Sequence, residues 1–374
     1  MLRSVYFPTI CVSLFMCFII VLGGCASGPA ADSSGIPQKN VPEKQAEVIQ
    51  PVVPDAEKTA PAATPKAERV KAQILFLRMD RPEGSVGPLP VGIDPAEIVR
   101  NIWIMDEGGG NAINITKNTA NVICADWSPD KSKIVCDSVN GSTYGFPTCA
   151  LYVMNADGSD MKKISPGGQS RHYPDWSPDG SKIVNCGYFT AQCPHPSSTP
   201  CKFFALYSSA QDGSVDQLLK LSPERPYDVL PRWLPDGKRI AFLRNESGYF
   251  GVYSGDINSG DSAKYNIESN LTYMPWFSLS TDATRIAFSH DFSKDYYHKG
   301  REIFVFDIGT GESLRLTNND YCDDYPCFSP DGKQVLFASS GDTEATWGMF
   351  VIDIDGKNLK KIPSKYGDLP MKWK

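Results

Sequence analysis

Short apolar runs alternate with polar turn sequences through most of this chain, and one pattern recurs. It first runs from Asp126 to Val135 as an acidic residue, an aromatic residue, Ser-Pro-Asp, a polar stretch and an apolar pair. Copies stand at 175–184, 232–242, 275–288 and 327–337, of which the fourth is looser. A spacing of roughly 43 to 57 residues is typical of propeller blades.

Each copy predicts the first two strands of a blade and the turn that joins them. The aromatic residue ends one strand, Pro presets the turn, and Gly supplies the positive φ that the turn requires, as at Pro178 and Gly180. A third strand, such as 302–307, and a fourth, such as 313–317, complete the unit.

Two incomplete repeats stand at the ends of the folded region, 71–374. Residues 73–78 match a second strand that lacks a first, whereas 368–373 match a first strand that lacks a second. The C-terminal strand therefore completes the first blade as its innermost strand, together with 101–106 and 112–116. Closure of this kind removes the open sheet edge that invites aggregation.

The sequence thus predicts an all-β fold, a six-bladed β-propeller of four-stranded antiparallel blades. The later blades are expected at roughly 121–165, 170–222, 228–268, 271–317 and 321–362.

The repeat Pro-x-Trp-Ser-Pro-Asp-Gly-x-x-Ile-Ala-Phe, followed by Ile-Tyr-Val-Met-Asp and Leu-Thr, resembles that of TolB-type six-bladed propellers. The resemblance covers essentially all of 71–374. It departs where Ala283 replaces Gly, where two residues are added after Trp276, and where Phe328 replaces Trp. No segment resembles the amino-terminal domain of TolB. TolB-type propellers dock partner peptides near the channel mouth, and the resemblance implies the same here.

The repeat also predicts two unequal faces. Turns between first and second strands, and between third and fourth, are short and uniform, and a meander places both sets on one face. The second-to-third loops at 79–100, 139–148, 187–202, 291–301 and 339–347 are more varied and lie on the other face. Variation confined to one face marks a candidate binding face.

Aromatic and polar residues gather in the loops and connections of this second face, a composition enriched in interface cores. The candidate binding residues are Tyr144, Phe146, Tyr188, Phe189, His195, Tyr227, Phe292, Tyr296, Tyr297, His298, Tyr325 and Trp347. The alternative is that many of these rings pack inward and hold the loops in place.

The start of the chain has the pattern of an export signal, since Arg3 precedes an apolar run and small residues. Leu22-Gly23-Gly24-Cys25 resembles the lipobox of bacterial lipoproteins, which implies removal of 1–24 and lipid attachment at Cys25. Several acyl chains on one residue give stable anchoring. An uncleaved membrane helix is the alternative. Ala26, rather than Asp, implies the outer membrane. The periplasmic side of that membrane is favoured, with exposure on the cell surface as the alternative.

Residues 25–70 predict a disordered tether behind the lipid. Proline recurs among Ala, Lys and Glu and no aromatic residue is present, so the segment buries too little apolar surface to fold. In an extended Pro-rich form it reaches on the order of 100 Å from the bilayer.

Composition excludes one class of partner. The chain has 374 residues, 41% of them hydrophobic, which is enough for a substantial core, and its net charge is −6. A nucleic acid partner is not expected, because no stripe of Lys and Arg is available to neutralise phosphates.

Eight of the 11 cysteines lie beyond the signal and Cys25, and an even number in an exported chain predicts disulfides. They are Cys124, Cys136, Cys149, Cys186, Cys193, Cys201, Cys322 and Cys327. Bridges within 121–222 are favoured: Cys124 with Cys136, Cys136 with Cys149, or pairs around the 187–202 insertion. Metal binding is the alternative, but without Cys-x-x-Cys or histidines at ligand spacing we expect no metal and no cofactor.

No catalytic motif of a hydrolase, metalloprotease or phosphate-binding loop is present. His172, Asp175, Asp323 and Asp324 are placed at the mouth of the central channel, where they would offer a cation or a sugar a weak site. The simpler interpretation of each histidine is a hydrogen-bonded loop residue. The aspartates of the repeated turns are structural, because their side chains bond nearby backbone.

These features favour a membrane-anchored, noncatalytic protein-binding scaffold of the cell envelope. The expected partner is an envelope protein or peptide, with a glycan as a further candidate. The alternative is a propeller enzyme, of lyase or lactonase type, acting on envelope or extracellular sugars.

Overall fold

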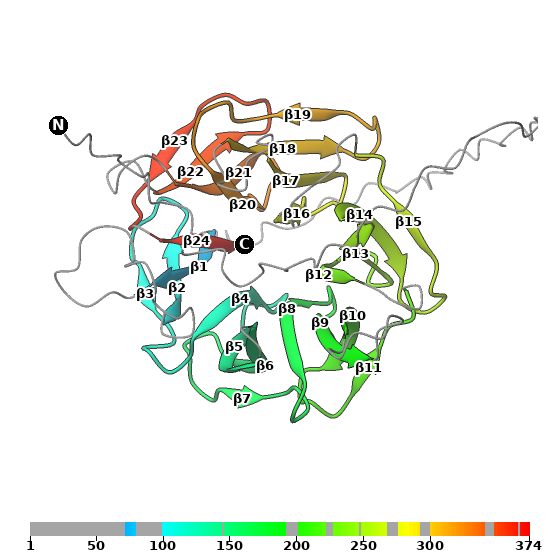
Figure 1. The fold of residues 1–374 in the computed structure, drawn as a ribbon. Coiled ribbons are helices and arrows are strands. Elements are labelled where there is room, and N and C mark those ends of the chain that lie inside the picture. Colours follow the sequence, from blue (N-terminus) through cyan, green and yellow to red (C-terminus); the bar gives the residue numbers. More distant parts are fainter. Residues whose placement is uncertain are drawn as a thin grey trace, which may run out of the picture. The chain divides into compact units, whose positions relative to one another are not determined.

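The computed structural model describes residues 72–79, 99–143, 146–191, 201–221, 227–246, 248–267, 276–291, 300–340, 348–365 and 367–374. Within them the strands form six four-stranded antiparallel sheets, arranged as blades around a centre (Figure 1). The predicted all-β, six-bladed propeller is therefore confirmed. The expected signal, Cys25 and the expected tether lie outside the described residues.

From the innermost strand outward, blade 1 consists of β24 (Leu369–Trp373), β1 (Gln73–Met79), β2 (Arg100–Asp106) and β3 (Ile113–Asn114), and the other blades have the same order. Blade 2 consists of β4 (Val122–Trp127), β5 (Lys133–Thr143), β6 (Phe146–Asn155) and β7 (Lys162–Lys163). Blade 3 consists of β8 (Ser170–Trp176), β9 (Lys182–Ala191), β10 (Cys201–Ala210) and β11 (Asp216–Leu218).

Blade 4 consists of β12 (Asp228–Trp233), β13 (Arg239–Glu246), β14 (Tyr249–Asp256) and β15 (Ser262–Lys264). Blade 5 consists of β16 (Phe277–Leu279), β17 (Arg285–Asp291), β18 (Arg301–Asp307) and β19 (Ser313–Arg315). Blade 6 consists of β20 (Asp323–Phe328), β21 (Gln334–Ser339), β22 (Gly348–Asp353) and β23 (Lys360–Ile362).

The ring closes between the two ends of the folded region, as the sequence predicts. β24 pairs antiparallel with β1, with Trp373 opposite Ile74. Backbone bonds between Gln73 and Lys374 extend this ladder, at 2.6 and 3.0 Å. Closure therefore depends on the last residues of the chain, which supply the edge partner that β1 would otherwise lack.

The turns between first and second strands share the same backbone hydrogen bonds. In blades 2, 3, 5 and 6 a serine hydroxyl also donates to the turn aspartate, whereas blade 4 has Leu234 at that position. In blade 2, Asp130 accepts bonds from the Ser128 hydroxyl at 2.6 Å and from the Ser132 amide at 3.0 Å. These bonds lower the pKa of Asp130 to about 2, the Ser128 bond contributing most. The structural role predicted for the turn aspartates is confirmed at this position.

The blades are held together by apolar side chains packed between neighbouring sheets. Trp176 of blade 3 belongs to one buried cluster with Val135 and Leu151 of blade 2. Trp373 of blade 1 packs in the same way with Leu336 of blade 6. The aromatic residue at the end of an inner strand thus contributes to the contact with the preceding blade, which explains why the repeat carries it.

The two faces differ in the length of their connections. Turns from first to second strand occupy 128–132, 177–181, 234–238, 280–284 and 329–333. Connections from second to third strand occupy 80–99, 144–145, 192–200, 247–248, 292–300 and 340–347. We call the face with the first set the turn face and the opposite face the loop face.

Two of the predicted loops are wrong in extent. The expected loop 139–148 is largely strand, since β5 and β6 stay paired as far as Thr143 opposite Phe146. The expected loop 187–202 is shortened to 192–200 because β9 and β10 pair as far as Ala191 opposite Cys201. Residues of high strand propensity, such as Tyr188 and Phe189, continue the ladder beyond the repeat.

Among the described residues, no helix has the length and hydropathy needed to cross a bilayer.

Candidate functional site

The residues predicted for the binding face are described only in part. Tyr144, His195, Phe292, Tyr296, Tyr297, His298 and Trp347 lie outside the described residues. Phe146 is placed on β6, and Tyr188 and Phe189 on β9, but their side chains are not described. Tyr227 and Tyr325 are described in full, so they show how rings of this set behave.

Both tyrosines pack against other rings. Tyr227 lies between Phe204 and Phe250, with ring centroids 4.7 and 5.9 Å away, and burial raises its pKa. Tyr325 is 9% exposed, and its ring lies 4.6 Å from that of Trp276. These two rings therefore agree with the alternative interpretation, in which the aromatic residues pack inward and hold the loops in place.

Tyr325 belongs to an apolar plug inside the ring. The inner strands of blades 3, 4 and 6 each carry a bulge, where Tyr173, Leu230 and Tyr325 have φ values of 56°, 52° and 57°. Bulges redirect side chains, and here all three residues share one buried cluster with Trp276. Tyr173 meets the Trp276 ring edge-on at 5.7 Å, although blade 4 separates their blades. Aromatic rings from blades 3, 5 and 6 thus contact one another inside the ring of blades.

A charged group lies on the turn-face side of the plug. Lys372 on β24 places its ammonium 3.3 Å from Asp126 of blade 2 and 3.1 Å from Asp175 of blade 3. Lys374 lies 4.0 Å from Asp126 and donates to the carbonyl of Trp127 at 2.9 Å. Ion pairs from the C-terminal strand therefore connect blade 1 with blades 2 and 3.

The same aspartates bind the backbone of the next blade. Asp126 accepts the amide of Trp176 at 3.0 Å, and Asp175 accepts that of Trp233 at 2.8 Å. Burial raises the pKa of Asp126, but the two lysine ammonium groups outweigh it and the pKa falls below its usual range. For Asp175, burial outweighs Lys372 and the pKa is raised. This group is structural, because its contacts lie between blades.

Sequence reasoning missed most of this charged group, although the repeat carries a signal for it. Asp126, Asp175, Arg232 and Lys372 all stand immediately before the aromatic residue that ends an inner strand. Equivalent positions in a propeller meet near the axis, so an alignment of the repeats by their aromatic residue predicts the cluster.

The four residues predicted for the channel mouth do not form one site. Asp324 pairs with Arg301 and accepts the hydroxyl of Ser289 at 2.7 Å. Asp323 accepts the side-chain amide of Asn319 at 2.8 Å, and burial raises its pKa to about 6. Asp175 belongs to the charged group above. The prediction that these four side chains converge is wrong. The bulge in β8 lies between His172 and Asp175. Asp323 and Asp324 are neighbours on β20, so their side chains point to opposite faces of the sheet.

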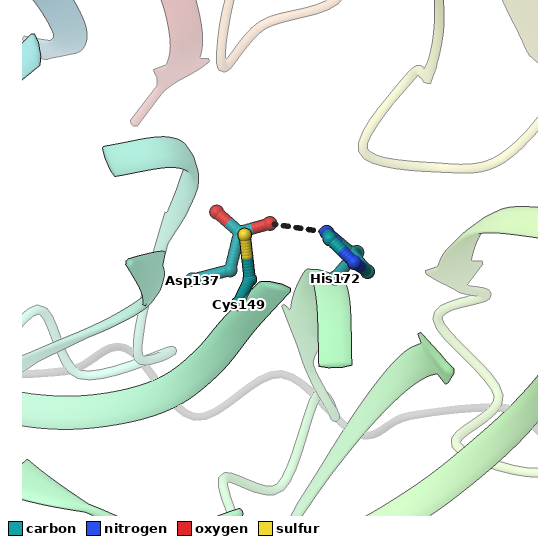
Figure 2. Close-up of side chains that lie close together, drawn as sticks. All are labelled: Asp137, Cys149 and His172. Carbon is teal, nitrogen blue, oxygen red and sulfur yellow. Dashed lines mark ion pairs between the residues drawn. The ribbon is translucent and has the colours of Figure 1, made fainter. Parts of the chain in front are cut away.

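His172 instead lies beside residues of blade 2 (Figure 2). Its Nδ1 is 3.9 Å from Asp137 on β5, and its Nε2 is 2.7 Å from the hydroxyl of Ser170 on its own strand. Cys149 on β6 completes a group whose ligand atoms all lie within 4.8 Å of one another. Burial lowers the pKa of His172 to about 4 and raises that of Asp137 to about 7.

The disulfides expected within 121–222 are not formed by the described cysteines. Cys124, Cys136, Cys186 and Cys327 are free thiols, and Cys149 and Cys322 also carry no disulfide. The register explains this: Cys136 lies opposite Ala125 and Tyr152, while Cys149 lies opposite Val139. Burial raises the pKa of Cys124 to about 12, so this thiol is unreactive. The side chains of Cys193 and Cys201 are outside the described residues.

Comparison with known proteins shows that part of the chain is similar in sequence to a known propeller domain. The family model described as TolB beta propeller domain matches residues 206–371. The chain is 30% identical over 136 residues to the Protein TolB homolog of Chlorobium chlorochromatii (strain CaD3). That match covers 36% of this chain and 28% of the relative's own length.

Solved structures share the fold. TolB from Acinetobacter baumannii is 20% identical with a TM-score of 0.59, over 81% of this chain and 66% of that one. Hydrazine synthase from Kuenenia stuttgartiensis is 13% identical with a TM-score of 0.57, over 80% of this chain and 47% of that one. At these sequence identities the similarity shows a shared fold only, and proteins as different as TolB and hydrazine synthase have this fold.

Proposed function

We propose that this protein is a lipid-anchored, noncatalytic scaffold of the bacterial cell envelope that binds a protein or peptide through its loop face. The observation that carries the proposal is the contrast between the two faces. Five first turns have one uniform build, whereas the connections of the loop face vary from 247–248 to 80–99 in extent. Variable loops on a constant scaffold are the usual place for recognition.

Buried ion pairs support the loop face from beneath. Asp368 receives two bonds of 2.7 Å from Arg78 at the end of β1. Asp228 receives two bonds of 2.9 Å from Arg244 near the end of β13. Paired side chains at the loop-bearing ends of strands fix the base of each loop, and a rigid base lowers the entropy lost on binding.

The apolar plug restricts how a partner docks. Because the rings of Tyr173, Trp276 and Tyr325 contact one another inside the ring of blades, we expect a peptide that approaches the axis to end there rather than thread through. Docking on one face, near the axis, is also what the resemblance to TolB-type propellers implies. The match of 206–371 to that propeller domain supports the same interpretation.

Anchoring is the second part of the proposal and rests on Leu22-Gly23-Gly24-Cys25. Lipid at Cys25, followed by the Pro-rich segment to residue 70, holds the propeller at the outer membrane on the periplasmic side. The enzyme alternative has less support, because Asp175, Asp323 and Asp324 are each engaged in separate buried contacts.

The test is affinity capture of the full-length lipidated protein from solubilised envelopes, with loop 292–299 replaced by a short Gly-Ser linker in a second sample. We expect one envelope protein to be captured by the wild type and lost with the loop. A matched control replaces the exposed turn-face residues 357–359 in the same way and retains the partner. A partner that is lost only with the turn-face change, or no partner in either sample, contradicts the proposal.

A further inference from the structure

Three different metal-binding side chains meet at the junction of blades 2 and 3. Asp137 comes from β5, Cys149 from β6 and His172 from β8 (Figure 2). One carboxylate oxygen, one sulfur and one ring nitrogen lie within 4.8 Å of one another. Oxygen, nitrogen and sulfur donors at this separation form the donor set that Zn²⁺ uses in proteins.

The site is closed to any ligand larger than an ion. Asp137, Cys149 and His172 are 0%, 1% and 2% exposed. Among the described residues, no lysine or arginine forms an ion pair with Asp137. A buried carboxylate needs a compensating positive charge, and a divalent cation bound by this carboxylate, a thiolate and a neutral imidazole gives a group of zero net charge.

The surrounding contacts orient the donors. Ser170 accepts the amide of Cys149 at 2.9 Å and shares a hydrogen bond with Nε2 of His172. This contact turns Nδ1 toward Asp137, whose second oxygen accepts the amide of Cys124 at 2.5 Å. Metal-bound histidines commonly have their other nitrogen fixed in this way, and bound carboxylates are themselves hydrogen-bonded.

The spacing is close to that of a bound ion. Nδ1 of His172 and Oδ2 of Asp137 are 3.9 Å apart. In a tetrahedral zinc site with bonds of about 2.0 Å, nitrogen and oxygen ligands lie about 3.3 Å apart. A bound ion would draw these two atoms together by roughly 0.6 Å.

From these contacts we propose that Asp137, Cys149 and His172 bind one divalent transition-metal ion of the Zn²⁺ class, which cross-links blades 2 and 3. The role is structural, since three strands from two blades share one ion. This inference is independent of the partner-binding proposal, because none of the three residues reaches the surface.

The test measures metal in the tag-free full-length protein, grown in zinc-supplemented medium and purified without chelator. We expect one equivalent of zinc per chain by mass spectrometry, and substoichiometric zinc in Cys149→Ala and His172→Ala. The matched control is Cys327→Ala, which removes an equally buried thiol from blade 6 and retains the ion.

Refolding the wild type with Co²⁺ gives a readout that needs no variant. A thiolate-to-cobalt charge-transfer band together with intense tetrahedral d–d bands supports the site. Three outcomes overturn the proposal: a wild type that binds neither zinc nor cobalt, bound cobalt without the thiolate band, or zinc that stays stoichiometric in folded Cys149→Ala and His172→Ala.

Discussion

The residue after the turn aspartate adopts a left-handed conformation whether or not the sequence provides glycine. Gly180 has φ of 72° in blade 3, and Ala283 has φ of 51° in blade 5. A Cβ costs roughly 1 to 2 kcal/mol in this region. At Gly180 a Cβ would meet only Pro129, at 3.6 Å, so the backbone conformation is the main cost.

The two positions therefore make a matched pair. We expect Gly180→Ala to lower the free energy of unfolding by about 1 kcal/mol and Ala283→Gly to raise it by less, because glycine also gains entropy in the unfolded chain. Urea denaturation of both variants measures this. Equal effects of the same sign would show that φ does not control stability at this turn.

Asp323 gives a pH dependence at the residue scale. Burial, with a smaller contribution from Glu302, raises its pKa from 3.8 to about 6 against hydrogen bonds from Ser339 and Asn319. Because the folded-state pKa is the higher one, the stability that protonated Asp323 contributes is present below pH 4 and is lost as the pH rises through 6.

The variant Asp323→Asn should remove this loss. We expect its melting temperature, relative to that of the wild type, to be higher at pH 8 than at pH 5. The corresponding change in the free energy of unfolding has an upper limit of about 3 kcal/mol. Melting curves of both proteins between pH 5 and pH 8 give the difference in melting temperature at each pH. The contributions of the other titrating groups cancel in this difference. A difference that does not change with pH would show that Asp323 is ionised throughout.

Single site residues were predicted with mixed success, for a physical reason. The repeat fixes which blade a residue belongs to, so His172 and Tyr325 were assigned to blades 3 and 6, but they were expected in connections and instead lie on the inner strands β8 and β20. Their contacts depend on the bulges, which rotate the side chains inward and leave no mark in the repeat. Tyr325 therefore packs in the plug, and the partners of His172 come from another blade.

At the scale of elements, the ring is closed by the pairing of β24 with β1, which joins the two ends of the folded region. Arg78 and Asp368 bridge it with two bonds of 2.7 Å, and their side chains are 8% and 0% exposed. Removing one partner of a buried pair leaves the other charge uncompensated and costs about 3 to 5 kcal/mol.

We therefore expect Asp368→Asn to lower the free energy of unfolding by about 3 kcal/mol. Asp355→Asn, which breaks an exposed pair with Lys357 on the turn face, serves as the control and changes stability little. Chemical denaturation compares the two variants. If Asp368→Asn is as stable as the control, the bridge does not hold the seam.

Strand existence was predictable from the sequence, whereas strand length was not. Every predicted blade is present, because aromatic residues and turn sequences mark the first hairpin of each repeat. The extensions of β5, β6, β9 and β10 into the expected loops follow from backbone pairing beyond the repeat. Such pairing is decided by the partner strand and so is not encoded in either segment alone.

At the scale of the whole molecule, one ring presents a uniform face and a variable face. The closure by β24 was predictable because two incomplete repeats complement each other. The charged group was predictable from an alignment of the repeats by their aromatic residue. The plug and the junction of Asp137, Cys149 and His172 were not, because each combines non-equivalent positions of different blades. All three connect side chains of different blades, which suits the proposed scaffold with recognition in its loops.

Photo-crosslinking in intact cells tests this account most directly. A photoreactive amino acid is placed at Tyr249 on the loop face, which is 46% exposed, and in a matched variant at Leu359 on the turn face, which is 56% exposed. We predict a crosslink from Tyr249 to one envelope protein, which is absent from Leu359 and weakened when Cys25→Ser releases the protein from the membrane. A crosslink from Leu359 alone, or products at both positions that do not depend on Cys25, would contradict the account.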